Sequence, residues 1–234
     1  VAAQKVAKEI GLDGTFIFED PQRGWKISRF IPNCRNMDPN NRDEVSHVMN
    51  MGRKLHEAPV KLDRHFDFYD ESQRYKSLLL KKGPIDIPGF KEMSDKFDRL
   101  ARYMRADNAP ICLCHNDFFS LNVLIDEQDT YYLIDWEYAG MGDYANDFGT
   151  FCVCCQLLED GATYALEAYF EREPTEAETR HNLGMIAMAG WCWYLWSLLK
   201  EAEGDYVGEW LYIYFNYAQK YIDRSLEGYE LAEE

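Results

Sequence analysis

The sequence predicts an α+β fold: a few short strands, at residues 15–31 and 123–134, combined with a mainly helical C-terminal part. Two observations predict it. Short apolar runs bounded by turn residues, at 15–31 and 123–134, are typical of strand hairpins. Longer stretches, such as 41–57 and 174–203, have apolar residues at helical spacing or end at a glycine, as helices do. With 234 residues, the chain forms one large domain, or one domain plus a fragment.

The N-terminal segment predicts a helix followed by a hairpin. Residues 1–10 place Val6, Ala7 and Ile10 on one helical face, and Gly11 ends the helix. Two strands, 15–19 and 25–31, are joined by a turn at 20–24.

Four later segments predict helices: 41–57, 88–107, 174–203 and 209–226. The apolar stripe of 88–107 is core packing rather than a cofactor site. Segment 174–203 opens with a proline and stops before Gly204. A further helix is predicted in the apolar run 148–158, with Asp147 as its cap. The tail, 227–234, is expected to be frayed.

Polar residues between the apolar runs of 111–147 form the most informative pattern: His115, Asp117, Asn122, Asp135 and Glu137. Four residues separate Asp117 from Asn122, which is the spacing of the phosphotransferase catalytic loop. Asp135 follows a predicted hairpin formed by strands 123–125 and 131–134.

Phosphoryl transfer explains this spacing. The protein must position an acceptor hydroxyl and hold Mg²⁺, which prefers hard oxygen ligands, against a triphosphate. We therefore assign Asp117 to orient and deprotonate the hydroxyl, and Asn122 and Asp135 to hold Mg²⁺. Turn-forming Asp and Asn residues in surface loops are the alternative. That alternative accounts for each residue alone, but not for the presence of several such polar residues, with their apolar flanks, at the spacing of a catalytic loop.

The charge balance limits the partners. The chain has 41 acidic and 25 basic residues, a net charge of −16. This argues against nucleic acid or an anionic membrane as partner and is compatible with a cationic substrate. No apolar run is long enough to span a bilayer and no signal-peptide pattern opens the sequence, so we expect a cytoplasmic protein without membrane insertion. The sequence does not fix the oligomeric state.

The seven cysteines are an odd number in a chain too large to need disulfides. Cys112 and Cys114 alternate on a predicted buried strand, and Cys152, Cys154 and Cys155 lie in an apolar predicted helix. A zinc site is disfavoured because the spacing is C-x-C and no pair of histidines follows. We expect reduced, buried thiols.

The segments HNDFFSLNVLI and LIDWEYAG resemble the choline/ethanolamine kinases, within the wider aminoglycoside-phosphotransferase-like group. The bacterial choline kinases are the most similar, and the Glu137-Tyr138 pair after Asp135 is the more specific element. The resemblance implies a protein-kinase-like fold that uses ATP and Mg²⁺. Residues 1–32 would be a remnant of the N-terminal ATP-binding lobe and hinge, and 33–234 a helical C-terminal lobe with the acceptor site.

The resemblance also implies binding residues. Backbone groups near Phe30 and Ile31 would meet adenine at the hinge. A quaternary ammonium has no hydrogen-bond donors and is best recognised by aromatic faces. Spacing alone favours core packing for the aromatic residues of the last two helices. The WYLW and YFNYAQ elements match the family, however, and their candidates for the choline site are Trp193, Trp196, Tyr214 and Tyr217.

Four further residues have a role by resemblance. Tyr138 is an additional substrate-binding candidate. Glu137 would either attract the cation or support the metal, and the sequence leaves both roles open. His56, at a helix end, is expected to hold a loop carbonyl rather than take part in catalysis. Asp147 is expected to support the catalytic loop through hydrogen bonds to its backbone.

Two departures from the family pattern leave alternatives open. The resemblance implies transfer of the ATP γ-phosphate to choline, giving phosphocholine, with ethanolamine, an aminoglycoside or another amino-alcohol as the alternative acceptors. Eukaryotic choline kinases have an acidic residue where this chain has FGTFCVCC, which leaves the choice between choline and ethanolamine open. No Gly-rich phosphate loop and no strand lysine with a matching helix glutamate precede the predicted hinge. We therefore expect a truncated sequence that does not bind ATP with full affinity as it stands. A non-catalytic choline-binding protein is the alternative of another class.

Overall fold

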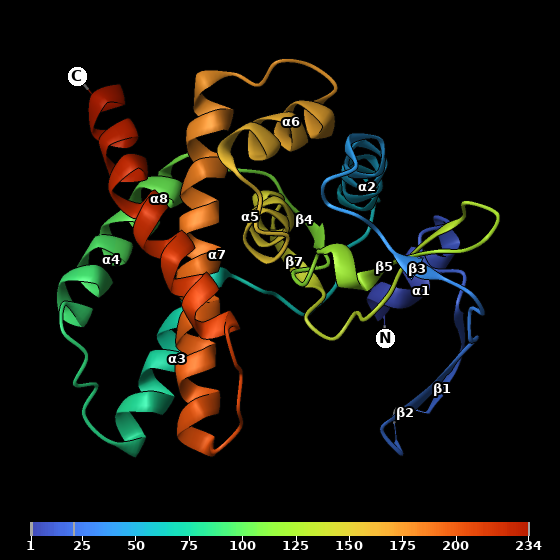
Figure 1. The fold of residues 1–234 in the computed structure, drawn as a ribbon, viewed down its shortest axis with the longest axis horizontal. Helices are drawn as coiled ribbons and strands as arrows, with labels where there is room; N and C mark the ends of the chain where they lie inside the picture. The colour runs from blue at the N-terminus through green and yellow to red at the C-terminus, as the bar shows by residue number, and fades with distance from the viewer. Residues whose placement is uncertain (1, 21, 234) are drawn as a thin grey trace.

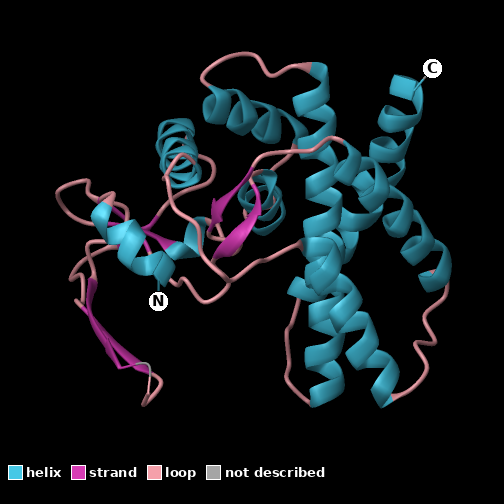
Figure 2. Cartoon of the chain, turned by 180° about the vertical axis from the view of Figure 1, so that it is seen from behind, coloured by secondary structure: helices cyan, strands magenta, loops and turns pink. Residues whose placement is uncertain are grey.

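The structure, a computed structural model, describes residues 2–20 and 22–233. Short strands lie on the side of the N-terminus, and long helices form the other side of the molecule (Figures 1 and 2). No helix in these residues is both long enough and apolar enough to cross a membrane. The α+β fold with a mainly helical C-terminal part is confirmed.

The strands form three small antiparallel sheets. Strands β1 (Phe16–Asp20) and β2 (Trp25–Ser28) form a hairpin that projects from the body (Figure 1). Strands β3 (Arg35–Asn36), β5 (Val123–Ile125) and β6 (Tyr131–Leu133) form the second sheet, with β5 in the middle. Strands β4 (Ile111–Cys114) and β7 (Gly140–Asp143) form the third. Both predicted hairpins are therefore present, although the second strand of the first one ends at Ser28; Pro21 in its turn lies outside the described residues.

The helices account for most of the remaining chain. The predicted ones are α1 (Ala2–Glu9), α2 (Arg42–His56), α4 (Phe90–Ala106), α5 (Ala145–Cys154), α7 (Glu176–Glu203) and α8 (Trp210–Glu233). Two were not predicted: α3 (Phe68–Lys82) and α6 (Glu159–Phe170). A 3₁₀ turn, η1 (Ser120–Asn122), immediately precedes β5.

Helix α7 is the centre of the helical part. It packs against α8, α5 and α3, and apolar residues cover most of its circumference, as expected for a helix enclosed by others. Trp191 of α7 is buried and stacks on Phe97 of α4 at a centroid distance of 4.8 Å. Helices α7 and α8 run side by side in both views (Figures 1 and 2).

The expectation of a frayed tail is wrong through Glu233. Tyr229, near the end of α8, is buried, and its hydroxyl donates to Asp107. Asp107 also pairs with Nδ1 of His181 at 2.7 Å, and Asp143 pairs with Nε2 of the same ring at 2.9 Å. Tyr229 therefore ties the last part of α8 to these ion pairs, and the helix continues to Glu233.

Candidate active site

The 115–122 loop is anchored by one buried carboxylate. Asp147 is 1% exposed; its Oδ2 accepts the backbone N–H of His115 at 2.9 Å and its Oδ1 that of Asn116 at 2.6 Å. Asn116 has a positive φ of 65°, so the chain turns sharply at this point. The expected support of the loop backbone by Asp147 is present. The prediction that Asp147 caps its helix is wrong, because the N-cap of α5 is Tyr144 and Asp147 lies inside the first turn.

His56, the last residue of α2, contacts the same carboxylate. Its Nε2 lies 2.9 Å from Asp147 Oδ2, and its Nδ1 lies 2.8 Å from the hydroxyl of Tyr169. The expected contact with a loop carbonyl is therefore wrong. Burial lowers the pKa of His56, but the hydrogen bond and charge of Asp147 outweigh it, and the pKa is raised above 6.5.

Asp117 and Asn122 meet within the loop. The amide nitrogen of Asn122 donates to both the backbone oxygen and Oδ2 of Asp117, each at 2.8 Å. Neither contact uses the amide oxygen of Asn122. Burial raises the pKa of Asp117; His115 and the Asn122 hydrogen bond oppose the rise, and the charges of Asp135 and Glu137 add to it. The three carboxylates are thus close enough to interact.

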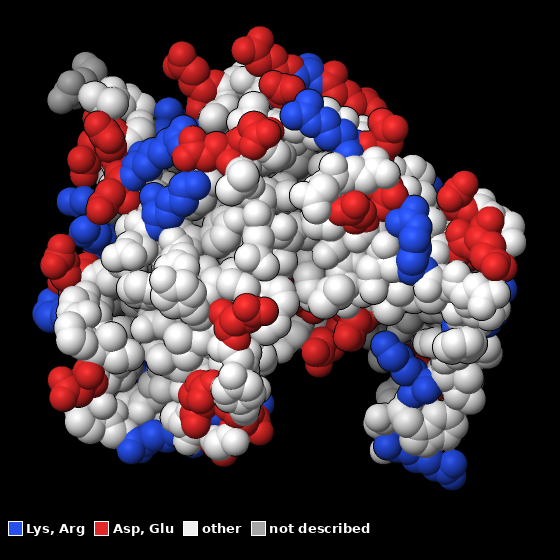
Figure 3. Space-filling view, viewed as in Figure 1, with Lys and Arg blue, Asp and Glu red and all other residues white. Residues whose placement is uncertain are grey.

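Asp135 is presented to solvent from an anchored turn. It is exposed and has a positive φ of 64°, a conformation that non-glycine residues adopt mainly in tight turns and functional sites. Its neighbour Trp136 is buried, and the indole N–H donates to Leu133 O at 3.0 Å and to Asp13 Oδ2 at 3.1 Å. Because Trp136 is fixed inward, Asp135 and Glu137 on either side of it remain exposed. Figure 3 shows acidic side chains at the upper edge of the hollow between the helical part and the projecting hairpin, and basic side chains on the hairpin.

Aromatic side chains from three parts of the chain pack around Trp193 of α7. Its ring makes edge contacts with Tyr138 at 5.2 Å and with Trp196 at 6.1 Å. The prediction that Trp193 and Trp196 share a face is confirmed. Phe66, in the stretch before α3 to which no chemistry had been assigned, lies 6.4 Å from Trp193 and 6.2 Å from Tyr138.

Helix α8 contributes Tyr214 but not Tyr217 to this region. Tyr214 stacks on Trp210 at 5.6 Å, and Trp210 makes an edge contact with Phe119 of the 115–122 loop at 6.4 Å. Burial raises the pKa of Tyr214, with a smaller contribution from the charge of Asp117. Tyr217 instead donates its hydroxyl to a backbone carbonyl at 2.9 Å and stacks on the ring one turn further along α8.

Phe119 and Trp210 were not predicted as site residues. The two rings contact each other but are far apart in the sequence, so local spacing does not indicate the contact.

Phe30 and Ile31, the predicted hinge residues, follow β2. Their side chains diverge: Phe30 is 84% exposed, and Ile31 is buried. Both residues lie outside the strands.

The site therefore combines three features. It has a carboxylate with a raised pKa, oxygen atoms suited to a hard cation, and a group of aromatic rings. This combination can orient a hydroxyl compound that bears a cationic group.

The chain is similar to known proteins at the level of family and of fold. The Phosphotransferase enzyme family (APH) matches residues 29–181. "Protein LicA" of Haemophilus influenzae is 28% identical over 224 residues; the match covers 89% of this chain, and the chain spans 62% of that protein's length.

Two solved structures show the same fold. The choline/ethanolamine kinase family protein of Mesorhizobium loti has a TM-score of 0.79 at 23% identity, covering 97% of this chain and 77% of its own. Choline kinase LicA of Streptococcus pneumoniae has a TM-score of 0.79 at 20% identity, covering 98% and 78%. The predicted kinase-like fold is confirmed.

Proposed function

Since the chain belongs to the Phosphotransferase enzyme family, we propose that it transfers the γ-phosphoryl group of ATP to the hydroxyl of choline, giving phosphocholine and ADP. The observation that carries the proposal is the meeting of Asp117 and Asn122 beside Asp135 and near the Trp193 aromatic group. The S. pneumoniae relative, described as a choline kinase, supports the same acceptor.

Asp117 receives the proton of the acceptor hydroxyl. Its Oδ2 is held by Asn122, which leaves Oδ1 to accept the hydroxyl hydrogen bond. The raised pKa of Asp117 moves the carboxylate toward the working pH, where a general base is most effective. As the hydroxyl oxygen bonds to the γ-phosphorus, its proton passes to Asp117 and the bond to the ADP oxygen breaks.

The donor set at the loop fits Mg²⁺. The amide oxygen of Asn122 is not used in the contact with Asp117, and Asp135 is exposed. Both atoms are hard oxygen ligands, which Mg²⁺ prefers. When bound, the metal neutralises charge on the phosphate oxygens during transfer. Glu137, exposed on the same turn, adds negative charge to this side of the site.

The group of aromatic rings determines which acceptor binds. Ring contacts group Tyr138, Trp193 and Trp196, of which Tyr138 and Trp196 are partly exposed, and Tyr214 packs on Trp210 of α8. A trimethylammonium group offers no N–H, so each well-placed ring contributes about 0.5–2 kcal/mol through its quadrupole. Tyr217, engaged elsewhere by its hydroxyl, serves packing in this proposal.

We further propose that residues 1–32 form the end of the nucleotide-binding lobe. The projecting β1–β2 hairpin leads into residues 30–32, whose backbone lies outside the strands. In this proposal adenine contacts the backbone near Phe30 and Ile31.

Ethanolamine is the second candidate acceptor, and Glu137 is the observation that favours it. A primary ammonium carries N–H donors and needs acceptors, and the exposed Glu137 carboxylate close to Asp117 provides them. An aminoglycoside would be better served by an open acidic cleft than by packed rings.

An ADP-release assay on the intact protein tests the proposal, with choline, ethanolamine and kanamycin as acceptors. We expect turnover with choline and a loss of about 100- to 10,000-fold in kcat for Asp117→Asn. Asp129→Asn is the matched control, since it removes the same charge from an exposed turn. Turnover with another acceptor would replace the choline assignment, and full activity of Asp117→Asn would contradict the assigned base.

A further inference from the structure

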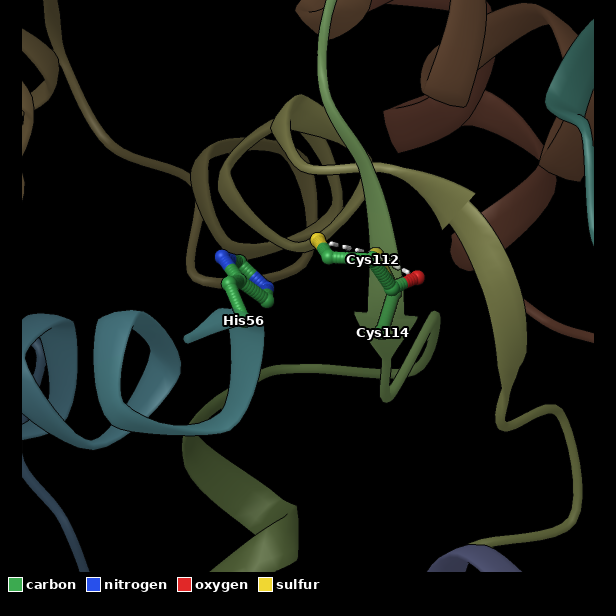
Figure 4. Close-up of side chains that lie close together, drawn as sticks. All are labelled: His56, Cys112 and Cys114. Carbon is green, nitrogen blue, oxygen red and sulfur yellow. Dashed lines mark hydrogen bonds between the residues drawn. The ribbon is translucent and has the colours of Figure 1, made fainter. Parts of the chain in front are cut away.

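A cluster of side chains of the types that bind metal ions lies at the junction of α2 and β4. Figure 4 shows His56, at the end of α2, beside Cys112 and Cys114 of β4. The two cysteines are two residues apart on a strand, so their side chains point to the same face. Their sulfur atoms are 3.8 Å apart, and one ligand atom from each of the three residues lies within 4.8 Å of the others.

We propose that these three residues form a site for a thiophilic metal ion, such as Zn²⁺, separate from the Mg²⁺ site. Two thiolates bound at about 2.3 Å to one tetrahedral Zn²⁺ are about 3.8 Å apart. The sulfur separation in β4 is therefore already that of a bound pair. One histidine with two cysteines is also the soft donor set that favours Zn²⁺ or Cu⁺ over Mg²⁺.

The hydrogen bonds of His56 decide which ring nitrogen binds the metal. Nε2 is held by Asp147 at 2.9 Å, and a carboxylate on the second ring nitrogen is the usual partner of a metal-binding histidine. Nδ1 is then the ligand atom. It now lies 2.8 Å from the Tyr169 hydroxyl, so metal binding displaces that hydroxyl from the ring.

The surroundings of the sulfur atoms suit a cation. Carbonyl oxygens of Gly142 and Asp143 lie 3.6 and 3.3 Å from Cys114 Sγ. These oxygens accept from the Cys114 thiol and repel a bare thiolate, so the thiol proton is lost only where a cation binds the sulfur. On binding, each cysteine loses its thiol proton to solvent and forms a sulfur–metal bond.

A route to the site exists. Cys112, His56 and Tyr169 line a cavity of about 470 Å³. A water molecule from this cavity completes a four-coordinate metal, with three ligands from the chain.

The site is linked to the 115–122 loop through one residue. Asp147 Oδ2 accepts both His56 Nε2 and the backbone N–H of His115. A metal that fixes the His56 ring therefore also fixes the carboxylate that holds the loop. Through this link, a metal bound at His56 and the two cysteines affects the active site without touching Asp117, Asn122 or Asp135.

Cobalt titration of the intact, chelator-treated and reduced protein tests the proposal without any activity measurement. Co²⁺ bound to thiolates gives a charge-transfer absorption that Zn²⁺ abolishes when it displaces the cobalt. We expect this band in the wild type and a loss of affinity of at least about tenfold in Cys112→Ser. The control Cys34→Ser, which removes a thiol outside the cluster, should leave the affinity unchanged.

Tyr169→Phe separates a metal site from a merely structural cluster. The substitution removes the hydroxyl that competes for Nδ1, so Co²⁺ affinity should rise, whereas a residue needed only for folding would lower it. A wild type without the charge-transfer band would overturn the proposal. A band that is equally strong in Cys112→Ser would do the same.

Discussion

The substitution Asp147→Asn tests how the 115–122 loop is held. It keeps the shape of the side chain but replaces one acceptor oxygen by an NH₂ donor. The carboxylate now accepts from the backbone of His115 and Asn116 and from the ring of His56. If the new NH₂ takes the Oδ1 place, the N–H of Asn116 loses its acceptor. If it takes the Oδ2 place, two donors lose theirs.

The magnitude follows from this count. Each buried donor left without a partner costs about 1–3 kcal/mol. At least one donor is lost, and the ion pair with His56 is lost with the charge, so Asp147→Asn should destabilise the fold by about 2–5 kcal/mol. Asp147→Ala removes all three acceptor contacts and should destabilise it more.

Urea unfolding measures this loss as a lower midpoint at an unchanged slope. The pKa of His56 is raised in the folded state, so its stabilisation is complete below its ordinary pKa of 6.5 and is lost as pH rises through the folded value. The wild type should therefore exceed Asp147→Asn by more at acidic than at alkaline pH. Asp160→Asn, on the exposed start of α6, is the control. A loss below about 0.5 kcal/mol, the range of ordinary surface substitutions, would refute the reasoning.

Three further predictions follow from the packing. Trp196→Ala should raise the KM for choline about 2- to 30-fold, the contribution of one ring, while Tyr217→Phe leaves it unchanged in steady-state kinetics. Burial lowers the pKa of His181, but its two carboxylate partners raise it to about 9. His181→Asn should therefore lower the free energy of unfolding, measured in urea, by about 3 kcal/mol below pH 6.5. This difference should disappear as the pH rises through about 9. Gly149→Ala should lower the melting temperature through a loss of about 1–3 kcal/mol, because its Cβ would lie 2.7 Å from Met185 O.

Local patterns in the sequence predicted the local parts of the site. The spacing of Asp117 and Asn122 places both in one loop, where they hydrogen-bond. Trp193 and Trp196 are three residues apart on a helix, so their sharing of a face follows from helical periodicity. The hairpin that precedes Asp135 was recognisable from its apolar runs and turn residues.

Contacts between distant segments were not predictable in this way. Phe66 lies in a polar stretch, and nothing local indicates that it packs on Trp193. The meeting of His56 with Cys112 depends on how the end of α2 lies against β4, so the C-x-C spacing alone argued against a metal. Similarly, the burial of Tyr229 depends on Asp107, far away in the sequence.

Phosphorus NMR of the intact protein with ATP, Mg²⁺ and choline tests the central claim most directly, because it identifies the product. We predict that the wild type forms ADP and phosphocholine in equal amounts. Asp117→Asn should form almost none, while Asp129→Asn behaves as the wild type. Release of inorganic phosphate without phosphocholine, or phosphocholine formed by Asp117→Asn at the wild-type rate, would contradict the account.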